Sequence, residues 1–218
     1  MSRMTETLPK FRREPAQQRQ EALILAALTL IAEHGVRGAT VREIAKQANV
    51  TQGLIRHHFS SKEDLITAAY AHHMKQMTDQ TAAPAKLAHA SAKARLAVFV
   101  VAGLKPPVSD PASVSLWASF LNKVRADAQM REIHKQTYHD FRGQLENLIS
   151  DVLNEAGTVV TAQKLRHLAI ACNAVIDGLW MEGGALPDEF ESGELPEIGL
   201  RSVGAIIGVK LEDTKDLI

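Results

Sequence analysis

A stretch of twenty residues that begins at Thr40 constrains the fold of this chain more than any other. Thr40 and Glu43 have the T-x-x-E spacing of a capping box, which satisfies free backbone N–H groups where a helix begins. Asn49 can adopt the left-handed conformation that ends a helix, and Thr51 is a good N-cap for a second helix, Gln52 to His58. Apolar residues recur at helical spacing along the first helix: Val41, Ile44, Ala45 and Ala48. The pattern predicts two short helices joined by a tight turn.

The second of these helices has two unlike faces. Its apolar residues are expected to point inward: Leu54, Ile55 and Phe59. Its outward residues are short or able to form hydrogen bonds: Thr51, Gln52, Arg56 and His57. This arrangement is typical of a helix-turn-helix, whose second helix enters the major groove of DNA. Gly53 has no side chain, so the backbone can approach a phosphate closely. The alternative on these residues alone is a buried helix pair that does not bind DNA.

The sequence from Val50 to Leu65, VTQGLIRHHFSSKEDL, resembles the recognition helix and the following helix of TetR-family repressors. The pattern of that family is roughly V-S-x-G-x-[LI]-Y-x-[HY]-F-x-[SN]-K-x-x-L. Arg56 stands where the family often has a tyrosine that contacts phosphate, and an arginine can hold a phosphate or read guanine. Lys62, at the start of the following helix, is placed to meet a phosphate. The predicted DNA-binding residues are therefore Thr40, Thr51, Gln52, Gly53, Arg56, His57 and Lys62.

Charge is distributed unevenly along the 218 residues, although the formal net charge is zero. Residues 1–75 contain 11 Lys+Arg and 7 Asp+Glu, whereas residues 76–218 contain 14 and 18. A basic first third beside an acidic remainder suits a DNA-binding head on a body that does not touch DNA. The polar and basic segment from Met1 to Pro15 is expected either to lie along DNA or to be a solvated tail.

Several classes of site are not expected. Cys172 is the only cysteine, which excludes an intrachain disulfide; it is interpreted as a buried hydrophobe rather than a reactive thiol. The pairs His57-His58 and His72-His73 point apart on a helix, so we expect no metal and no cofactor. Neither a signal peptide nor an apolar run of about 18 residues is apparent, which predicts a cytoplasmic protein.

Helical patterns recur along the whole chain and predict an all-α fold, with an N-terminal three-helix DNA-binding head and a C-terminal helical ligand-binding and dimerisation domain. The expected domains are residues 1–61 and 62–218. Gly35 is expected to end the first helix, and Asp110 and Thr161 to cap later ones. The expected helices are Ala16–His34, 40–48, 52–58, 60–80, Lys86–Leu104, one that follows Asp110, Ala128–Ala156, Ala162–Glu182 and Pro196–Val209.

Two of these helices predict a homodimer. Ala162–Glu182 is apolar over more than one face. The last helix carries glycines beside its aliphatic residues, which would permit close approach of a partner helix: Gly199, Gly204 and Gly208. In the TetR family a four-helix bundle, with two helices from each subunit, joins the dimer, and the resemblance implies the same interface here. A two-fold dimer would read two half-sites of a palindromic operator. The alternative is an intrachain core.

Aromatic residues of the second domain are the candidate ligand-binding residues: Phe99, Trp117, Phe120, Tyr138, Phe141 and Trp180. Ordinary core packing is the alternative. The segments SLWASFL, from Ser115, and AVIDGLWM, from Ala174, resemble the C-terminal domain of BetI-type regulators, a TetR subgroup that controls choline and glycine betaine metabolism. The resemblance implies a small-molecule inducer such as choline or betaine aldehyde, which tryptophan faces hold by cation–π attraction. An apolar or aromatic metabolite is the alternative ligand.

Three classes of function follow from these patterns. The favoured one is a ligand-responsive transcriptional repressor that binds double-stranded DNA as a homodimer, without a membrane partner. An enzyme is not expected, because no nucleophile–base order, phosphate loop or H-E-x-x-H spacing is present. A helical adaptor that does not bind DNA is the third class.

Overall fold

The computed structural model describes residues 16–87 and 91–211, and within these ranges the chain forms α-helices and one short 3-10 helix without any β-strand. The all-α prediction is therefore confirmed. The segment from Met1 to Pro15, with its expected DNA-binding or solvated role, lies outside the described residues, as do residues 88–90 of the expected helix Lys86–Leu104. No described helix is both long enough and apolar enough to cross a membrane.

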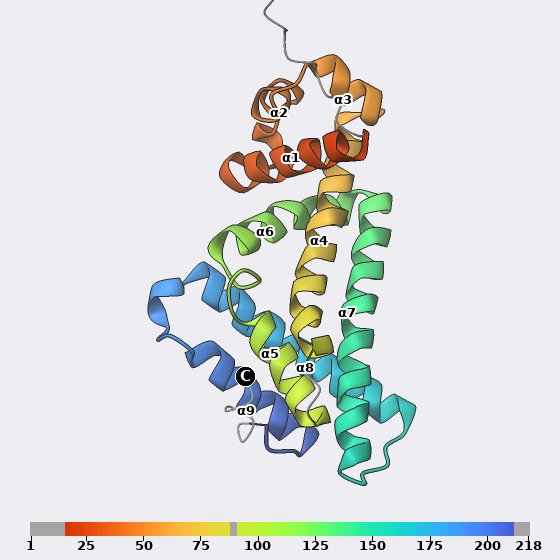
Figure 1. The fold of residues 1–218 in the computed structure, drawn as a ribbon, viewed down its shortest axis with the longest axis vertical. Helices are drawn as coiled ribbons and strands as arrows, with labels where there is room; N and C mark the ends of the chain where they lie inside the picture. Colours follow the sequence, from red (N-terminus) through yellow and green to blue (C-terminus); the bar gives the residue numbers. More distant parts are fainter. Residues whose placement is uncertain (1–15, 88–90, 212–218) are drawn as a thin grey trace, which may run out of the picture.

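Three helices make a head at one end of an elongated molecule (Figure 1). They are α1 (Ala16–Gly38), α2 (Val41–Gln47) and α3 (Gln52–His58). Thr40 caps α2 as predicted, since its Oγ1 accepts a hydrogen bond from the backbone N–H of Glu43 at 3.2 Å. Asn49 has a φ of 53°, the predicted left-handed conformation, and it turns the chain into α3. Gly35 has a φ of 68° and interrupts the helical conformation of α1 near its predicted end.

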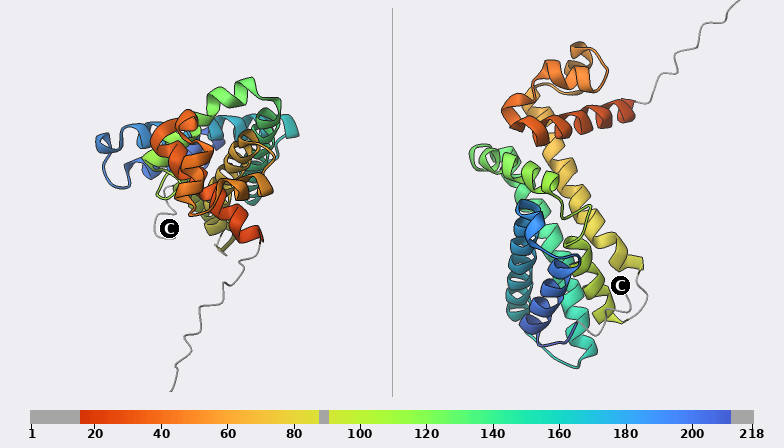
Figure 2. Two further views of the ribbon diagram at one scale, coloured as in Figure 1. Left: turned by 90° about the horizontal axis from the view of Figure 1, so that it is seen from above. Right: turned by 90° about the vertical axis from the view of Figure 1, so that its left-hand side faces the viewer.

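Helix α4 (Lys62–Leu87) runs from the head into the body (Figure 2). The sequence predicted its end near Gln80, and this was wrong, because the helix continues through Pro84. A proline inside a helix removes one backbone hydrogen bond and crowds the preceding turn, which normally favours termination. Here Thr81, Ala82 and Ala85 are buried, so packing of the last turns against the body offsets that loss.

The body contains the remaining helices: α5 (Ala92–Gly103), α6 (Pro111–Ala126), α7 (Ala128–Glu155), α8 (Ala162–Ala185), the 3-10 helix η1 (Pro187–Glu189) and α9 (Glu194–Ile207). Helices α5 to α8 each start after a residue whose side chain caps the helix, including the predicted Asp110 and Thr161. Ser91 caps α5, so that helix begins later than the predicted Lys86. Helix α9 begins at Glu194, two residues before the expected start at Pro196.

Two hydrophobic cores hold these helices together. One fills the body between α4, α5, α7, α8 and α9. The other belongs to the head but extends beyond it: Leu116, Phe120 and Val124 of α6 and Met130 of α7 are buried in the same cluster as Leu23, Ile44 and Ile55. The head is therefore packed on α6 and on the start of α7, as well as being joined through α4.

The glycines near the C-terminus are used within the chain. A Cβ on Gly199 would collide with Leu104, and one on Gly204 would lie 2.6 Å from the carbonyl oxygen of Val209. Gly208 has a φ of 72° and caps α9. Gly199 and Gly204 therefore admit neighbouring parts of the same chain rather than a partner helix, contrary to the prediction, whereas a Cβ on Gly208 would meet nothing within 4 Å. Helix α8 continues past its expected end at Glu182, and Gly183 and Gly184 in its last turn allow Leu195 and Val114 to approach.

Candidate DNA-binding face and candidate ligand cavity

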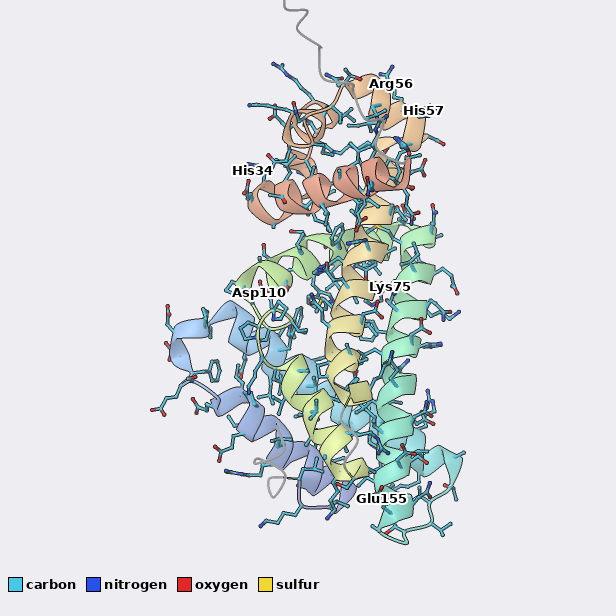
Figure 3. All side chains as sticks on the ribbon, viewed as in Figure 1. His34, Arg56, His57, Lys75, Asp110 and Glu155 are labelled. Atoms are coloured by element: carbon cyan, nitrogen blue, oxygen red, sulfur yellow. The ribbon has the colours of Figure 1, made fainter. Side chains whose placement is uncertain are left out.

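The outer surface of α3 carries the predicted DNA-binding residues at the end of the head. Ile55 and Phe59 are buried, whereas the five predicted residues of this helix and its cap are exposed: Thr51, Gln52, Gly53, Arg56 and His57. Arg56 and His57 lie on α3 at the end of the molecule away from the body (Figure 3). Thr40 is also exposed, at the start of α2. The predicted division of α3 into an inward and an outward face is therefore present in the structure.

Lys62 has a second contact that the sequence did not suggest. Its Nζ donates a hydrogen bond to the backbone carbonyl of Val36 at 3.2 Å, and the side chain is half-buried. This contact ties the start of α4 to the chain that follows the break in α1. An ammonium group has three donors, so the bond to Val36 leaves capacity for a phosphate.

A cavity of about 60 Å³ lies in the body between α4, α6, α7 and α8. Four of the six predicted aromatic residues line it: Trp117, Tyr138, Phe141 and Trp180. The two tryptophan rings meet edge to face, with centroids 5.8 Å apart. The rest of the wall is mainly apolar and includes Met74, Met77, Val108 and Ile176.

The other two predicted aromatic residues lie outside the cavity wall. Phe99 is fully buried in the body core, where its ring centroid is 5.2 Å from that of Phe141. Phe120 is fully buried beside Tyr70, at a centroid distance of 5.0 Å, in the core shared with the head. Both residues therefore pack in the core, which was the alternative to a role in ligand binding.

Two polar residues of α8 that were not among the predicted site residues also line the cavity, Asn173 and Asp177. Asn173 is 6 % exposed, and its Nδ2 donates a hydrogen bond to Oδ2 of Asp177 at 2.7 Å. Burial raises the pKa of Asp177 to about 6, while the bond from Asn173 and the nearby charge of Arg142 oppose this rise. Asp177 follows Asn173 at the i, i+4 spacing of about one helical turn. This spacing in the sequence indicates that both side chains lie on one face of the helix. A half-buried carboxylate is therefore part of the wall of an aromatic cavity.

Most hydrogen-bond donors of the wall are already engaged within the protein. Trp180 donates from Nε1 to the carbonyl of Val108 at 2.8 Å, and the side chain of Trp117 is hydrogen-bonded to that of Tyr138. The wall threonines each donate to a backbone carbonyl in their own helix: Thr78, Thr81 and Thr137. Acceptors remain, because the buried Oδ1 of Asn173 has no partner among the described residues. Electrostatically, the cavity suits a group of positive charge.

Aromatic contacts continue from the cavity toward the head. The ring of Tyr138 lies 4.6 Å from that of His134, centroid to centroid. The hydroxyl of Tyr70 on α4 is hydrogen-bonded to Nδ1 of His134, and burial lowers the pKa of His134. Since Tyr70 also packs against Phe120, a chain of direct contacts joins the cavity wall to the core shared with the head.

The sequence also offered a cysteine and several histidines as candidate reactive or metal-binding groups. Cys172 is fully buried, and burial raises its pKa to about 12, which keeps it a thiol as interpreted from the sequence. Burial lowers the pKa of His73 to about 4. His57 and His58 meet edge to face, 5.2 Å apart. No group of three or more side chains suited to a metal ion occurs in the described ranges.

Helices α8 and α9 pack side by side, and each keeps a face that the body does not cover (Figure 2). Ala171, Ala174 and Met181 of α8 are exposed, opposite to the buried Cys172, Ile176 and Trp180. On α9, Ala205 is exposed while Val203 and Ile207 are buried. Small and apolar side chains on an outer face are compatible with a helical interface.

Comparison with known families agrees with this architecture. Residues 23–69 match the profile of bacterial regulatory proteins of the tetR family, and residues 92–208 match that of the BetI-type transcriptional repressor C-terminal domain. The chain is 26 % identical over 175 residues to the HTH-type transcriptional regulator BetI of Burkholderia thailandensis, covering 80 % of this chain and 86 % of that protein.

Solved structures show the same fold. A transcriptional regulator from Pseudomonas aeruginosa PAO1 aligns with a TM-score of 0.82 and 27 % identity, covering 94 % of this chain and 97 % of its own. A regulator from Saccharomonospora viridis in complex with choline has a TM-score of 0.65 and 21 % identity, covering 92 % and 96 %. The regulator FadR from Bacillus subtilis, in complex with stearoyl-CoA, has a TM-score of 0.67 and 20 % identity, covering 86 % and 97 %.

The BetI-type profile alone spans more than half of the chain, and it follows the helix-turn-helix in the expected order. This protein therefore belongs to the TetR family of DNA-binding transcriptional regulators and has a C-terminal domain of the BetI type.

Proposed function

We propose that this protein is a homodimeric repressor that binds a palindromic operator and is released from it by a compact cationic inducer. The observation that carries the proposal is the cavity whose wall contains Trp117, Tyr138 and Trp180 together with Asp177. Aromatic faces attract quaternary ammonium groups, at about 0.5–2 kcal/mol for each cation–π contact. The half-buried carboxylate of Asp177 adds charge complementarity. Choline and betaine aldehyde are the first candidates.

Residues 1–61 are proposed to form the DNA-binding domain and residues 62–218 the ligand-binding and dimerisation domain. The exposed set on α3 supports base or phosphate contacts by Gln52, Arg56 and His57. Thr40, Thr51, Gly53 and Lys62 are proposed to contact the DNA backbone. Two heads related by a two-fold axis would enter successive major grooves about 34–36 Å apart, or a multiple of that distance.

Replacement of Lys62 by glutamine is expected to weaken binding to all DNA sequences alike. Glutamine keeps an N–H donor for the carbonyl of Val36 but removes the charge, so the head should stay folded. The slope of log affinity against log salt concentration should fall by about one, as for the loss of one phosphate contact. Fluorescence anisotropy on operator and random DNA over a salt series measures this. An unchanged slope would remove Lys62 from the phosphate contacts.

A ligand releases DNA only if it binds better to a conformation whose heads are wrongly spaced for the operator. Helix α4 supplies the route for such a change, because it lines the cavity through Met74, Met77 and Thr78 and begins at the head with Lys62. A displacement of its body end would therefore reposition the head. Typical coupling of about 1–3 kcal/mol corresponds to a fall in operator affinity of about 5–150-fold.

Titration of a labelled operator complex with choline, betaine aldehyde, glycine betaine and a panel of apolar metabolites tests the inducer. We expect release by a cation and none by fatty acids or their thioesters, because the cavity is about 60 Å³ and is edged by a carboxylate. The mainly apolar wall supports a second candidate, a neutral aromatic or apolar metabolite. Release by such a compound, with no effect of any cation, would replace the cationic inducer and leave the repressor function standing.

A further inference from the structure

We infer that Asn173 is a specificity-determining residue of the cavity, and that the inducer carries a hydrogen-bond donor as well as a positive charge. The inference rests on the proposed cationic inducer and adds the second chemical group. Its starting point is the side-chain amide of Asn173, which lines the cavity at 6 % exposure and has an oxygen without a partner among the described residues.

The orientation of this amide is fixed by its neighbour. When it is ionised, Asp177 can only accept hydrogen bonds, so the amide nitrogen of Asn173 must face it, as in the 2.7 Å bond from Nδ2 to Oδ2. The reversed amide would place two acceptors together. The carbonyl oxygen of Asn173 is consequently turned away from Asp177, where the described residues supply no donor.

A buried polar atom without a hydrogen bond is costly, and proteins rarely leave one without a reason. No described donor is bonded to this oxygen, and that includes the hydroxyl of Tyr138 in the same cavity wall. The indole N–H groups of Trp117 and Trp180 are bonded elsewhere, and Thr78, Thr81 and Thr137 donate to carbonyls of their own helices. A donor brought by the ligand would satisfy Oδ1 of Asn173 at the moment of binding.

The need for a hydrogen-bond donor at Asn173 distinguishes cations that otherwise resemble each other. An amino alcohol with a quaternary nitrogen offers a hydroxyl proton to Asn173 and its charge to Asp177 and the aromatic rings. The methyl ether of the same cation has the charge and nearly the same shape but no donor. A carboxylate at that position would add negative charge beside Asp177 and a further acceptor beside Asn173. The site therefore selects an alcohol over the corresponding ether or acid.

Binding to the full-length protein at pH 8 tests the inference, because Asp177 is then ionised. The two tryptophans of the chain both line the cavity, so intrinsic fluorescence reports directly on it. The probes are choline, its O-methyl ether, glycine betaine and tetramethylammonium. The wild-type protein is expected to bind choline about 3–10-fold more tightly than the ether, which is the usual effect of one hydrogen bond.

The variant Asn173→Leu has nearly the same shape but no acceptor, and the expected result is that its choline-to-ether ratio falls to about one. The ratio is the readout because loss of the bond to Asp177 affects both cations equally. Equal binding of choline and ether by the wild-type protein overturns the inference without need of the variant. Preserved discrimination in Asn173→Leu also overturns it. Binding of none of the cations, tetramethylammonium included, instead rejects the proposed cationic inducer itself.

Discussion

The variant Ala174→Glu is expected to be a monomer with little affinity for the operator. Ala174 lies on the uncovered face of α8, beside the uncovered face of α9, and this combined surface is the proposed dimer interface. A glutamate there would bury an unpaired charge, or meet its own copy across the two-fold axis, and either outcome is strongly unfavourable. Since one head alone loses the benefit of bivalent binding, operator affinity should fall about 10²–10⁴-fold.

The measurement combines sedimentation equilibrium with operator binding. Ala118→Glu, at an exposed alanine of α6, is the matched control and should remain a dimer with wild-type affinity. Ala174 is a better site than Ile206, which is half-buried and packs against the body core, so a charge at Ile206 would also disturb the subunit. A dimeric Ala174→Glu with normal operator binding would place the interface on another surface.

The variant Asp177→Asn is expected to lose most of its response to a cationic inducer while its fold becomes more stable. Removing a half-buried charge from the wall of the proposed cation site should weaken binding about 10–100-fold. In the free protein the same carboxylate is unfavourable, since burial raises its pKa from 3.8 to about 6. Asparagine avoids that cost, so the thermal midpoint at pH 7.5 should rise by a few degrees.

The pH dependence has a definite sign. A carboxyl whose folded pKa is raised destabilises the fold where it is ionised, so stability should increase as pH falls from 7 through about 6 toward 4. Binding of a cation needs the ionised form, so wild-type affinity should fall over the same range. The charge of Arg142 lowers the pKa of both Asp177 and Tyr138, and the charge of Asp177 raises the pKa of Tyr138. Asp177→Asn should show neither trend.

Fluorescence titration of choline between pH 5 and 8, with thermal melts at each pH, measures both effects. Asp140→Asn, at an exposed carboxylate of α7, is the control and should match the wild-type protein in both. Undiminished inducer affinity in Asp177→Asn would show that the carboxylate does not face the ligand. A lower thermal midpoint would show that the carboxylate is better solvated or better paired than its burial implies.

The fold of the head and the order of the helices could be predicted from local sequence patterns. The T-x-x-E cap at Thr40, the left-handed Asn49 and the outward set on α3 all follow from interactions within a few residues. Such features survive in any tertiary context that keeps the helices. The resemblance to BetI-type regulators came from short segments of α6 and α8 for the same reason, and the profile match confirmed it.

Which residues form the cavity depends on how the helices pack, and it could not be predicted from local sequence. Phe99 and Phe141 have the same kind of helical pattern, yet Phe99 fills the core behind the wall and Phe141 lines the space. Aromatic residues at helical spacing serve a core and a cavity equally well, and the choice depends on how α4, α6, α7 and α8 pack. The same packing uses the glycines of α9 within the chain and carries α4 through Pro84. It also brings Trp117 of α6 to the cavity wall that Asn173, Asp177 and Trp180 of α8 share, because contacts between distant helices depend on crossing geometry that local sequence does not encode.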